Sequence, residues 1–209
     1  VIDAGTGDTT YQASVAWDKG TEDKILIGYK SDNKGCVKVG TISGAAGSES
    51  ISFGVELQYT TENVTAVGGR PPPLLCLDTS GNYLIVFAIA ASSYDTYARV
   101  IQVSDTTATA GGSNTVLSTD INGNSGTATV DSSDNTKVIF GFLEDPSEKG
   151  ALKELSISGT TITVGSENLG DIQGSTGMDV LSITATKLIF SATTNGTFYP
   201  TYQIVTNDG

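Results

Sequence analysis

The chain has 209 residues, with 11 Lys and Arg against 23 Asp and Glu for a net charge of −12, and it contains no histidine. The missing histidine excludes Ser-His-Asp triads, Cys-His pairs and His-ligated zinc sites. The acidic balance argues against nucleic acid and anionic lipid as partners, because both are bound through Lys and Arg, and the apolar runs are too short for membrane insertion as a helix.

Short runs of β-branched and aromatic residues recur along the chain, bounded by Gly, Asn, Asp and Ser. Such turn signals about every 8–12 residues, without helical periodicity, are typical of an all-β protein. Four of the runs resemble one another, and their continuous apolar character suits strands that are covered on both faces. These four runs are residues 25–29, 84–88, 138–142 and 188–192.

Similar segments surround each of these four central runs. A short strand precedes each one, and in three cases it ends in an Asp that begins a turn: Asp18, Asp78 and Asp131. Asp caps its own backbone in such turns, so we predict a structural rather than a catalytic role for these residues. A third, alternating strand and a polar fourth strand follow. The third strands are residues 37–43, 98–104, 152–158 and 202–206, and the fourth strands, each ending in Gly, are residues 51–54, 108–111 and 162–165.

The last repeat lacks its own fourth strand, but the N-terminal residues match the missing one. Four units of four antiparallel strands predict a four-bladed β-propeller as one repeat domain over residues 1–209. Pairing of Val1, Ile2, Ala4 and Gly5 with the last blade would close the ring and remove an edge. The predicted blades are residues 11–54, 70–111, 125–165, and 177–205 together with 1–5.

Three alternatives to the closed four-bladed ring stay open. The chain could be part of a larger propeller, or its repeats could stack as a β-sandwich or β-solenoid. The N-terminal strand could also pair with a neighbouring molecule, which would produce a head-to-tail filament through strand exchange.

Candidate ligand contacts lie in the loops between strands, at residues 19–24, 58–73, 91–96, 144–150 and 193–198. Tyr94 and Tyr97 cluster near one blade edge, and Tyr199 and Tyr202 near another. Tyr faces stack on sugar rings and anchor protein interfaces, so these four are the predicted ligand-binding residues. Trp17 lies in a first strand and is predicted to be in the core.

Catalytic and metal-binding residues are not predicted. The loop carboxylates Asp95, Glu144 and Asp145 form no pair that the sequence links across repeats, and no calcium-binding loop can be traced. We therefore expect no cofactor, no resident metal and no enzymatic activity. Cys36 and Cys76 either form one disulfide or are two half-buried thiols.

The phrase Val-Gly-Thr-Ile-Ser-Gly at residues 39–44, followed by residues 51–54, has a counterpart at residues 155–165. This strand, turn, strand, Gly unit resembles repeats in large structural and fibre-type proteins of bacteriophages, particularly marine ones, and in some bacterial surface proteins. The second repeat departs from the pattern at residues 104–107, and the fourth departs more. The resemblance implies a structural or recognition role in a virion or at a cell surface.

Two functions follow as hypotheses. The first is a non-enzymatic structural or recognition module of an extracellular or virion assembly, held by protein-protein contacts with other structural proteins or with further copies of itself. The second is a lectin-like domain that binds cell-surface glycans through its Tyr-bearing loops.

Overall fold

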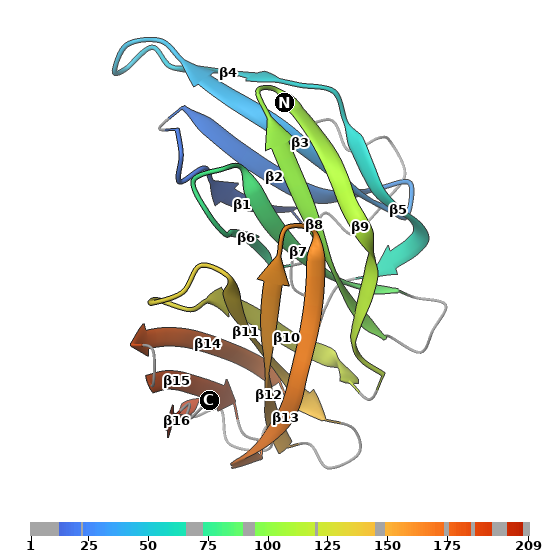
Figure 1. Ribbon diagram of the computed structural model, residues 1–209, viewed down its shortest axis with the longest axis vertical. Coiled ribbons are helices and arrows are strands. Elements are labelled where there is room, and N and C mark those ends of the chain that lie inside the picture. Colours follow the sequence, from blue (N-terminus) through green and yellow to red (C-terminus); the bar gives the residue numbers. More distant parts are fainter. Residues whose placement is uncertain are drawn as a thin grey trace.

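The computed structural model describes residues 13–21, 23–65, 73–89, 95–119, 121–144, 149–173, 176–184, 187–193 and 200–206. These residues form an all-β architecture of 16 strands (Figure 1). Consecutive strands run antiparallel and group into meanders, as the recurring runs predict. Within the described residues, no helix is long and apolar enough to cross a membrane.

The first and second meanders belong to one large sheet. The first contains β1 (Ala13–Trp17), β2 (Lys24–Ser31), β3 (Lys34–Ser43) and β4 (Ser50–Phe53). The second contains β6 (Leu74–Cys76), β7 (Asn82–Ile89), β8 (Thr96–Ser104) and β9 (Thr107–Ser118). A linking strand, β5 (Leu57–Thr65), pairs with both β3 and β7, so that nine strands form one sheet.

The third and fourth meanders are separate sheets. The third has β10 (Ile121–Val130), β11 (Lys137–Glu144), β12 (Lys149–Ser158) and β13 (Thr161–Gln173). The fourth has β14 (Thr176–Thr184), β15 (Lys187–Thr193) and β16 (Pro200–Thr206). The four predicted central runs lie in β2, β7, β11 and β15, so the strand prediction is confirmed at these positions.

The four-bladed propeller prediction is wrong. Among the described residues no sheet closes on itself, and the strands form open sheets of nine, four and three strands. The physical reason lies in β5, which was predicted to be a loop and instead joins the first two meanders. The residues predicted to close the ring (Val1, Ile2, Ala4 and Gly5) lie outside the described residues.

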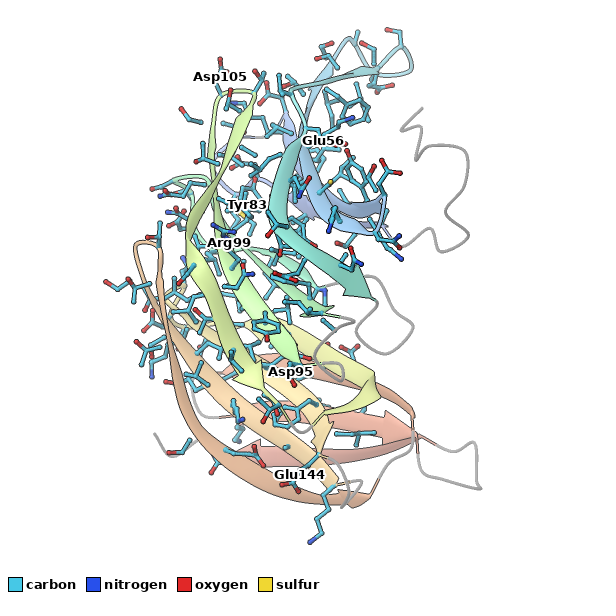
Figure 2. All side chains as sticks on the ribbon, turned by 90° about the vertical axis from the view of Figure 1, so that its right-hand side faces the viewer. Glu56, Tyr83, Asp95, Arg99, Asp105 and Glu144 are labelled. Carbon is cyan, nitrogen blue, oxygen red and sulfur yellow. The ribbon has the colours of Figure 1, made fainter. Side chains whose placement is uncertain are left out.

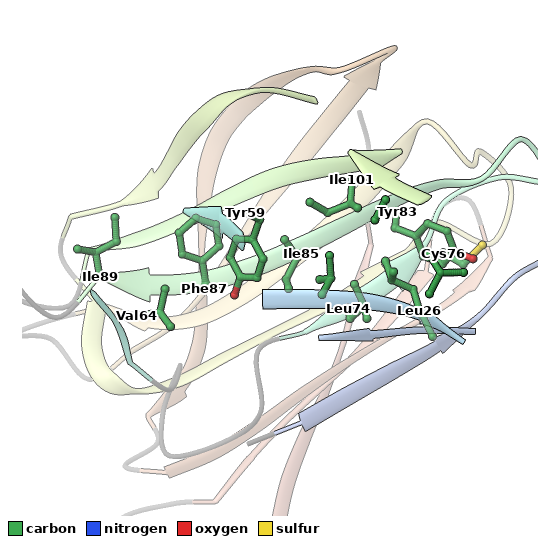
Figure 3. Close-up of a cluster of buried hydrophobic side chains, with 14 residues drawn as sticks. Leu26, Tyr59, Val64, Leu74, Cys76, Tyr83, Ile85, Phe87, Ile89 and Ile101 are labelled. Atoms are coloured by element: carbon green, nitrogen blue, oxygen red, sulfur yellow. The ribbon is translucent and has the colours of Figure 1, made fainter. Parts of the chain in front are cut away.

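Tyr59 explains why β5 forms a strand at this place. Its side chain is 1% exposed and its ring contacts the ring of Phe87 with 5.1 Å between centroids (Figure 3). A Cβ atom at Gly35 would collide with the Tyr59 ring, so only glycine at that position of β3 leaves room for it. Burial of this large side chain stabilises a segment whose other residues are mostly polar.

The core lies between successive meanders rather than in one centre. The face of the first meander that carries Leu26 packs against the face of the second that carries Ile85 and Phe87 (Figure 3). The opposite face of the second, with Leu84 and Val100, packs against Phe140 and its neighbours in the third. The apolar run of the second meander is therefore covered on both faces, as it is in other buried sheets.

The predicted fourth strand ends next to its Gly only in the first meander, because β9 and β13 continue past Gly111 and Gly165. Two of these glycines have a packing role. A Cβ atom at Gly54 would collide with the carbonyl oxygen of Thr106, and one at Gly111 would collide with the side chain of Thr160. Thr106 and Thr160 each occupy the hairpin turn of the following meander. In the first two meanders the recurring Gly therefore lets the next meander approach closely.

The recurring Asp residues form the predicted turns. The amide nitrogens of Gly20, Ser80 and Ser133 donate to the Oδ1 atoms of Asp18, Asp78 and Asp131, at 2.7, 2.8 and 2.7 Å respectively. Each donor lies two residues after its Asp, which is the geometry of an Asx turn. Their structural role is therefore confirmed.

Candidate functional site

The outer face of the first meander is apolar and is turned away from the second meander. Strand pairing places Trp17 opposite Ile25, Ile25 opposite Gly40, and Gly40 opposite Phe53. Directly paired residues point to the same side of a sheet, so these residues form one row. Val15 and Ile27 belong to the next row on the same side. We call this side the first end face.

The first end face exposes several large apolar side chains. The exposed fractions are 62% for Val15, 52% for Trp17, 48% for Ile51 and 38% for Phe53, while Ile25 between them is 8% exposed. Ile51 lies on this side because it pairs with Ile42, which packs with Ile25. The prediction that Trp17 is a core residue is wrong: within β1 it is Ala16 that faces the second meander.

Side chains from neighbouring strands fill the space over Gly40 in the middle of this face. A Cβ atom there would lie 2.9 Å from Cγ1 of Ile25, 3.2 Å from Cγ2 of Ile51 and 3.2 Å from Cε1 of Phe53. These contacts show that side chains from β2 and β4 meet over the glycine. The result is a continuous apolar surface across the width of the meander.

A small polar cluster lies beside the apolar part of the first end face. The Tyr29 hydroxyl donates to the Glu56 carboxylate, and Nζ of Lys38 lies 3.5 Å from Oε2 of Glu56. The Lys38 ammonium is also 5.8 Å from the centroid of the Tyr29 ring, within the range of a cation–π contact. Glu56 follows β4 at this edge of the sheet (Figure 2).

Burial and the Glu56 carboxylate together keep the Tyr29 hydroxyl and the nearby Cys36 thiol protonated. Burial, followed by the Glu56 carboxylate, raises the pKa of Tyr29 well above its usual range. The same two causes raise the pKa of the Cys36 thiol to about 12. A thiol that stays protonated is a poor nucleophile, so Cys36 is a packing residue. Cys36 and Cys76 are both free and buried, so they do not form a disulfide.

A second end face lies at the opposite end of the molecule, on the fourth meander (Figure 1). Leu181 pairs with Ile189, and Ile189 pairs with Ile204. Leu181 and Ile204 are each 59% exposed, while the neighbouring Val180 is 4% exposed. Oγ of Ser182 accepts a hydrogen bond from the Ser132 amide at 3.0 Å. The side of β14 that carries Val180 and Ser182 therefore faces the third meander, and Leu181 lies on the opposite side.

The predicted Tyr residues do not form a site in the described part of the chain. Tyr97 on β8 is half-buried, and its ring is stacked on Phe87 with 6.0 Å between centroids. Its hydroxyl donates to Oδ2 of Asp95 at 3.5 Å. Tyr202 lies on β16 opposite Ser191, in a different sheet. Tyr94 and Tyr199 lie outside the described residues, as does Asp145.

The sequence contained a signal for the first end face that was not recognised. Val15 and Trp17 alternate with Ala16, and Ile51 and Phe53 alternate with Ser52, so each strand has one apolar side. In the outermost repeat of a stack, the chain covers only one of the two apolar sides. No group of three or more acidic or Cys side chains in the described ranges could hold a metal ion.

Comparisons with known proteins assign no family to the chain. No family model matches the sequence, and no curated protein matches it. Among solved structures, a triple mutant of AofleA from Arthrobotrys oligospora is similar, with 10% sequence identity and a TM-score of 0.44. The match covers 97% of this chain and 63% of that one, so this chain spans less than two thirds of that protein's length.

Proposed function

We propose that the chain is a non-enzymatic structural module that self-associates, with the first end face as a contact surface. The observation that carries the proposal is the exposure of Val15, Trp17, Ile51 and Phe53 on one side of one meander. Exposed apolar patches mark interaction surfaces in soluble proteins. Trp is also among the residues that contribute most to binding energy when a partner covers it.

The filled middle of this face supports a protein partner over a small ligand. Side chains of Ile25, Ile51 and Phe53 occupy the space over Gly40, and all three are aliphatic or aromatic. Small-molecule sites are concave and combine apolar walls with converging polar groups. An apolar sheet face suits another sheet, as in the packing between the meanders of this chain.

Glycan binding is the weaker candidate. It rests on four Tyr residues, and the stacking of Tyr97 on Phe87 gives that side chain a packing role. A place for the assembly outside the cell or in a virion stays a prediction from the repeat resemblance.

Sedimentation equilibrium of the full chain tests the proposal. The average mass should rise above 21.5 kDa as the protein concentration increases from about 1 µM to about 1 mM. Trp17→Ser should move this rise to at least ~10-fold higher concentration, because a desolvated Trp contributes on the order of 2 kcal/mol to binding. Val116→Ser is the matched control, since Val116 is 47% exposed but lies on β9, away from both end faces.

If the original chain and Trp17→Ser both keep the mass of the monomer over the whole concentration range, the proposal is wrong. An equal loss of association in Trp17→Ser and Val116→Ser would also contradict it, because the contact would then not depend on the first end face.

A further inference from the structure

The third strands of the first three meanders carry a basic side chain at the same position. Lys38 pairs with Ile27, Arg99 pairs with Ile85, and Lys153 pairs with Phe140. Ile27, Ile85 and Phe140 are each the fourth residue of their strands β2, β7 and β11. The three basic residues therefore occupy equivalent sites, each on the side of its meander that faces toward the N-terminal end of the stack.

In the second and third meanders this basic residue reaches the strand that precedes it in the stack. Arg99 donates through Nη1 to the backbone carbonyl of Tyr59 on β5. Nζ of Lys153 donates to the carbonyl of Leu117 on β9 at 3.0 Å. At both places the charged group binds a carbonyl that belongs to the preceding part of the stack.

Lys38 matches Lys153 in its other contacts as well. Lys153 lies 5.1 Å from the centroid of the Phe142 ring and 3.1 Å from Glu167, as Lys38 lies over Tyr29 and beside Glu56. Lys38 differs from Lys153 in one contact: within the described part of the chain, it has no hydrogen bond to the carbonyl of a preceding strand. The first end face thus has the chemistry of an internal interface without its partner.

The second end face matches the other side of those internal interfaces. Leu181, Ile189 and Ile204 form a row across β14, β15 and β16. In the first two meanders the next meander covers the equivalent rows. These are Ala16, Leu26 and Val39 in the first, all buried, and Leu75, Leu84 and Val100 in the second, of which Leu75 is half-buried.

We propose that the second end face of one copy packs on the first end face of another, continuing the internal stacking between molecules. This inference rests on the proposed self-association and names its geometry. Six of the eight large apolar side chains that are exposed among the described residues lie on these two faces. The contact is head-to-tail, so each copy uses two different surfaces and a free surface remains at each end.

Two single variants, each disabling one face, separate this geometry from its rivals. Val15→Glu places a charge on the first end face and keeps Trp17 as a fluorescent reporter, while Leu181→Glu places one on the second. Each variant alone should remain monomeric. An equal mixture should form a 1:1 complex that grows no further, because Leu181→Glu still offers the first face and Val15→Glu still offers the second.

Trp17 is the single Trp of the chain and lies on the first end face, so its emission identifies the occupied surface. In the mixture, the Trp17 emission of Leu181→Glu should shift to shorter wavelengths as the face is covered. To separate the two signals, the Val15→Glu protein used in this mixture, and only there, also carries Trp17→Phe. Lys38→Met should weaken association of the original chain by about 10-fold, as expected for the loss of one hydrogen bond from a charged donor.

The possible results distinguish the two proposals. If Leu181→Glu alone associates as well as the original chain, the first end face pairs with itself; this inference is then wrong and the proposed function stands. If the original chain never associates and its Trp17 emission does not change with concentration, both are wrong. Circular dichroism verifies that each variant is folded, and Ile204→Thr and Ile51→Thr replace any variant that is not.

Discussion

The two sides of the first meander have similar sequences and different environments. On the inner side, Leu26 is fully buried against the second meander. On the outer side, Trp17 and Val15 are more than half exposed although they belong to the same meander and to an equally apolar pattern. Alternating apolar residues therefore identify a surface that requires a partner, and whether the chain itself supplies that partner depends on the position of the repeat in the stack.

The largest expected effect tests the inner side. Phe87 is fully buried and contacts Tyr59, so Phe87→Ala should lower the free energy of unfolding by ~3–5 kcal/mol through the cavity that it leaves. Urea unfolding at a concentration where the chain is monomeric measures this loss. Ile204→Ala, on the second end face, is the contrast and should cost less than ~1 kcal/mol. Equal losses at the two positions would remove the distinction between internal and end faces.

The next effect concerns the close approach of the first two meanders. Gly54→Ala should destabilise the fold by ~1–3 kcal/mol, because the new methyl group collides with the carbonyl oxygen of Thr106 and forces the backbone to shift. Ser52→Ala, two residues earlier on exposed β4, is the control and should have little effect. Thermal unfolding compares the two variants. A Gly54→Ala variant as stable as the control would show that the meanders are not in such close contact there.

A third effect concerns the pH dependence of the polar cluster beside the first end face. The folded-state pKa of Cys36 is raised from 9.0 to about 12 by burial and by Glu56. Between these two values the unfolded thiol loses its proton while the folded thiol keeps it, so stability falls as pH rises through this window. Cys36→Ala should therefore lose less stability than the original chain between pH 9 and pH 12. If the original chain and Cys36→Ala lose equal free energy of unfolding over this pH window, the raised pKa of Cys36 is contradicted.

The smallest effect on stability is expected on the outer side. Trp17→Ser should change the free energy of unfolding of the monomer by only ~0.5 kcal/mol, because about half of the side chain is already in contact with water. The same variant is expected to weaken self-association. Chemical denaturation of the dilute protein measures the first quantity. A loss comparable to that of Phe87→Ala would place Trp17 in the core, as the sequence had suggested.

The strands and turns could be predicted from sequence because their signals are local. The four central runs and the Asx turns at Asp18, Asp78 and Asp131 appear at the predicted places, whereas the fourth strands of the second and third meanders continue past the Gly that was predicted to end them. The predicted arrangement of the sheets was wrong because it depended on β5. That strand contains Gln58, Thr60 and Glu62, which read as a loop, and its burial depends on Tyr59 meeting Gly35 some 24 residues earlier.

Less of the candidate site than of the fold could be predicted from the sequence. The Tyr residues were selected because aromatic loops often bind ligands, yet Tyr97 is packed on Phe87. The exposed side of β1 has the same alternation as a buried strand, and only tertiary structure shows which side is covered. The equivalence of Lys38, Arg99 and Lys153 also depends on strand register, which the positions of these residues in the sequence do not reveal.

Quenching of Trp17 fluorescence by acrylamide tests the central claim most directly, because the chain's single Trp lies on the first end face. We predict that quenching of the original chain becomes less efficient as the protein concentration rises, and that quenching of Val15→Glu does not change. If Trp17 is quenched equally at all concentrations in both proteins, the first end face remains open to solvent and is not a surface for self-association.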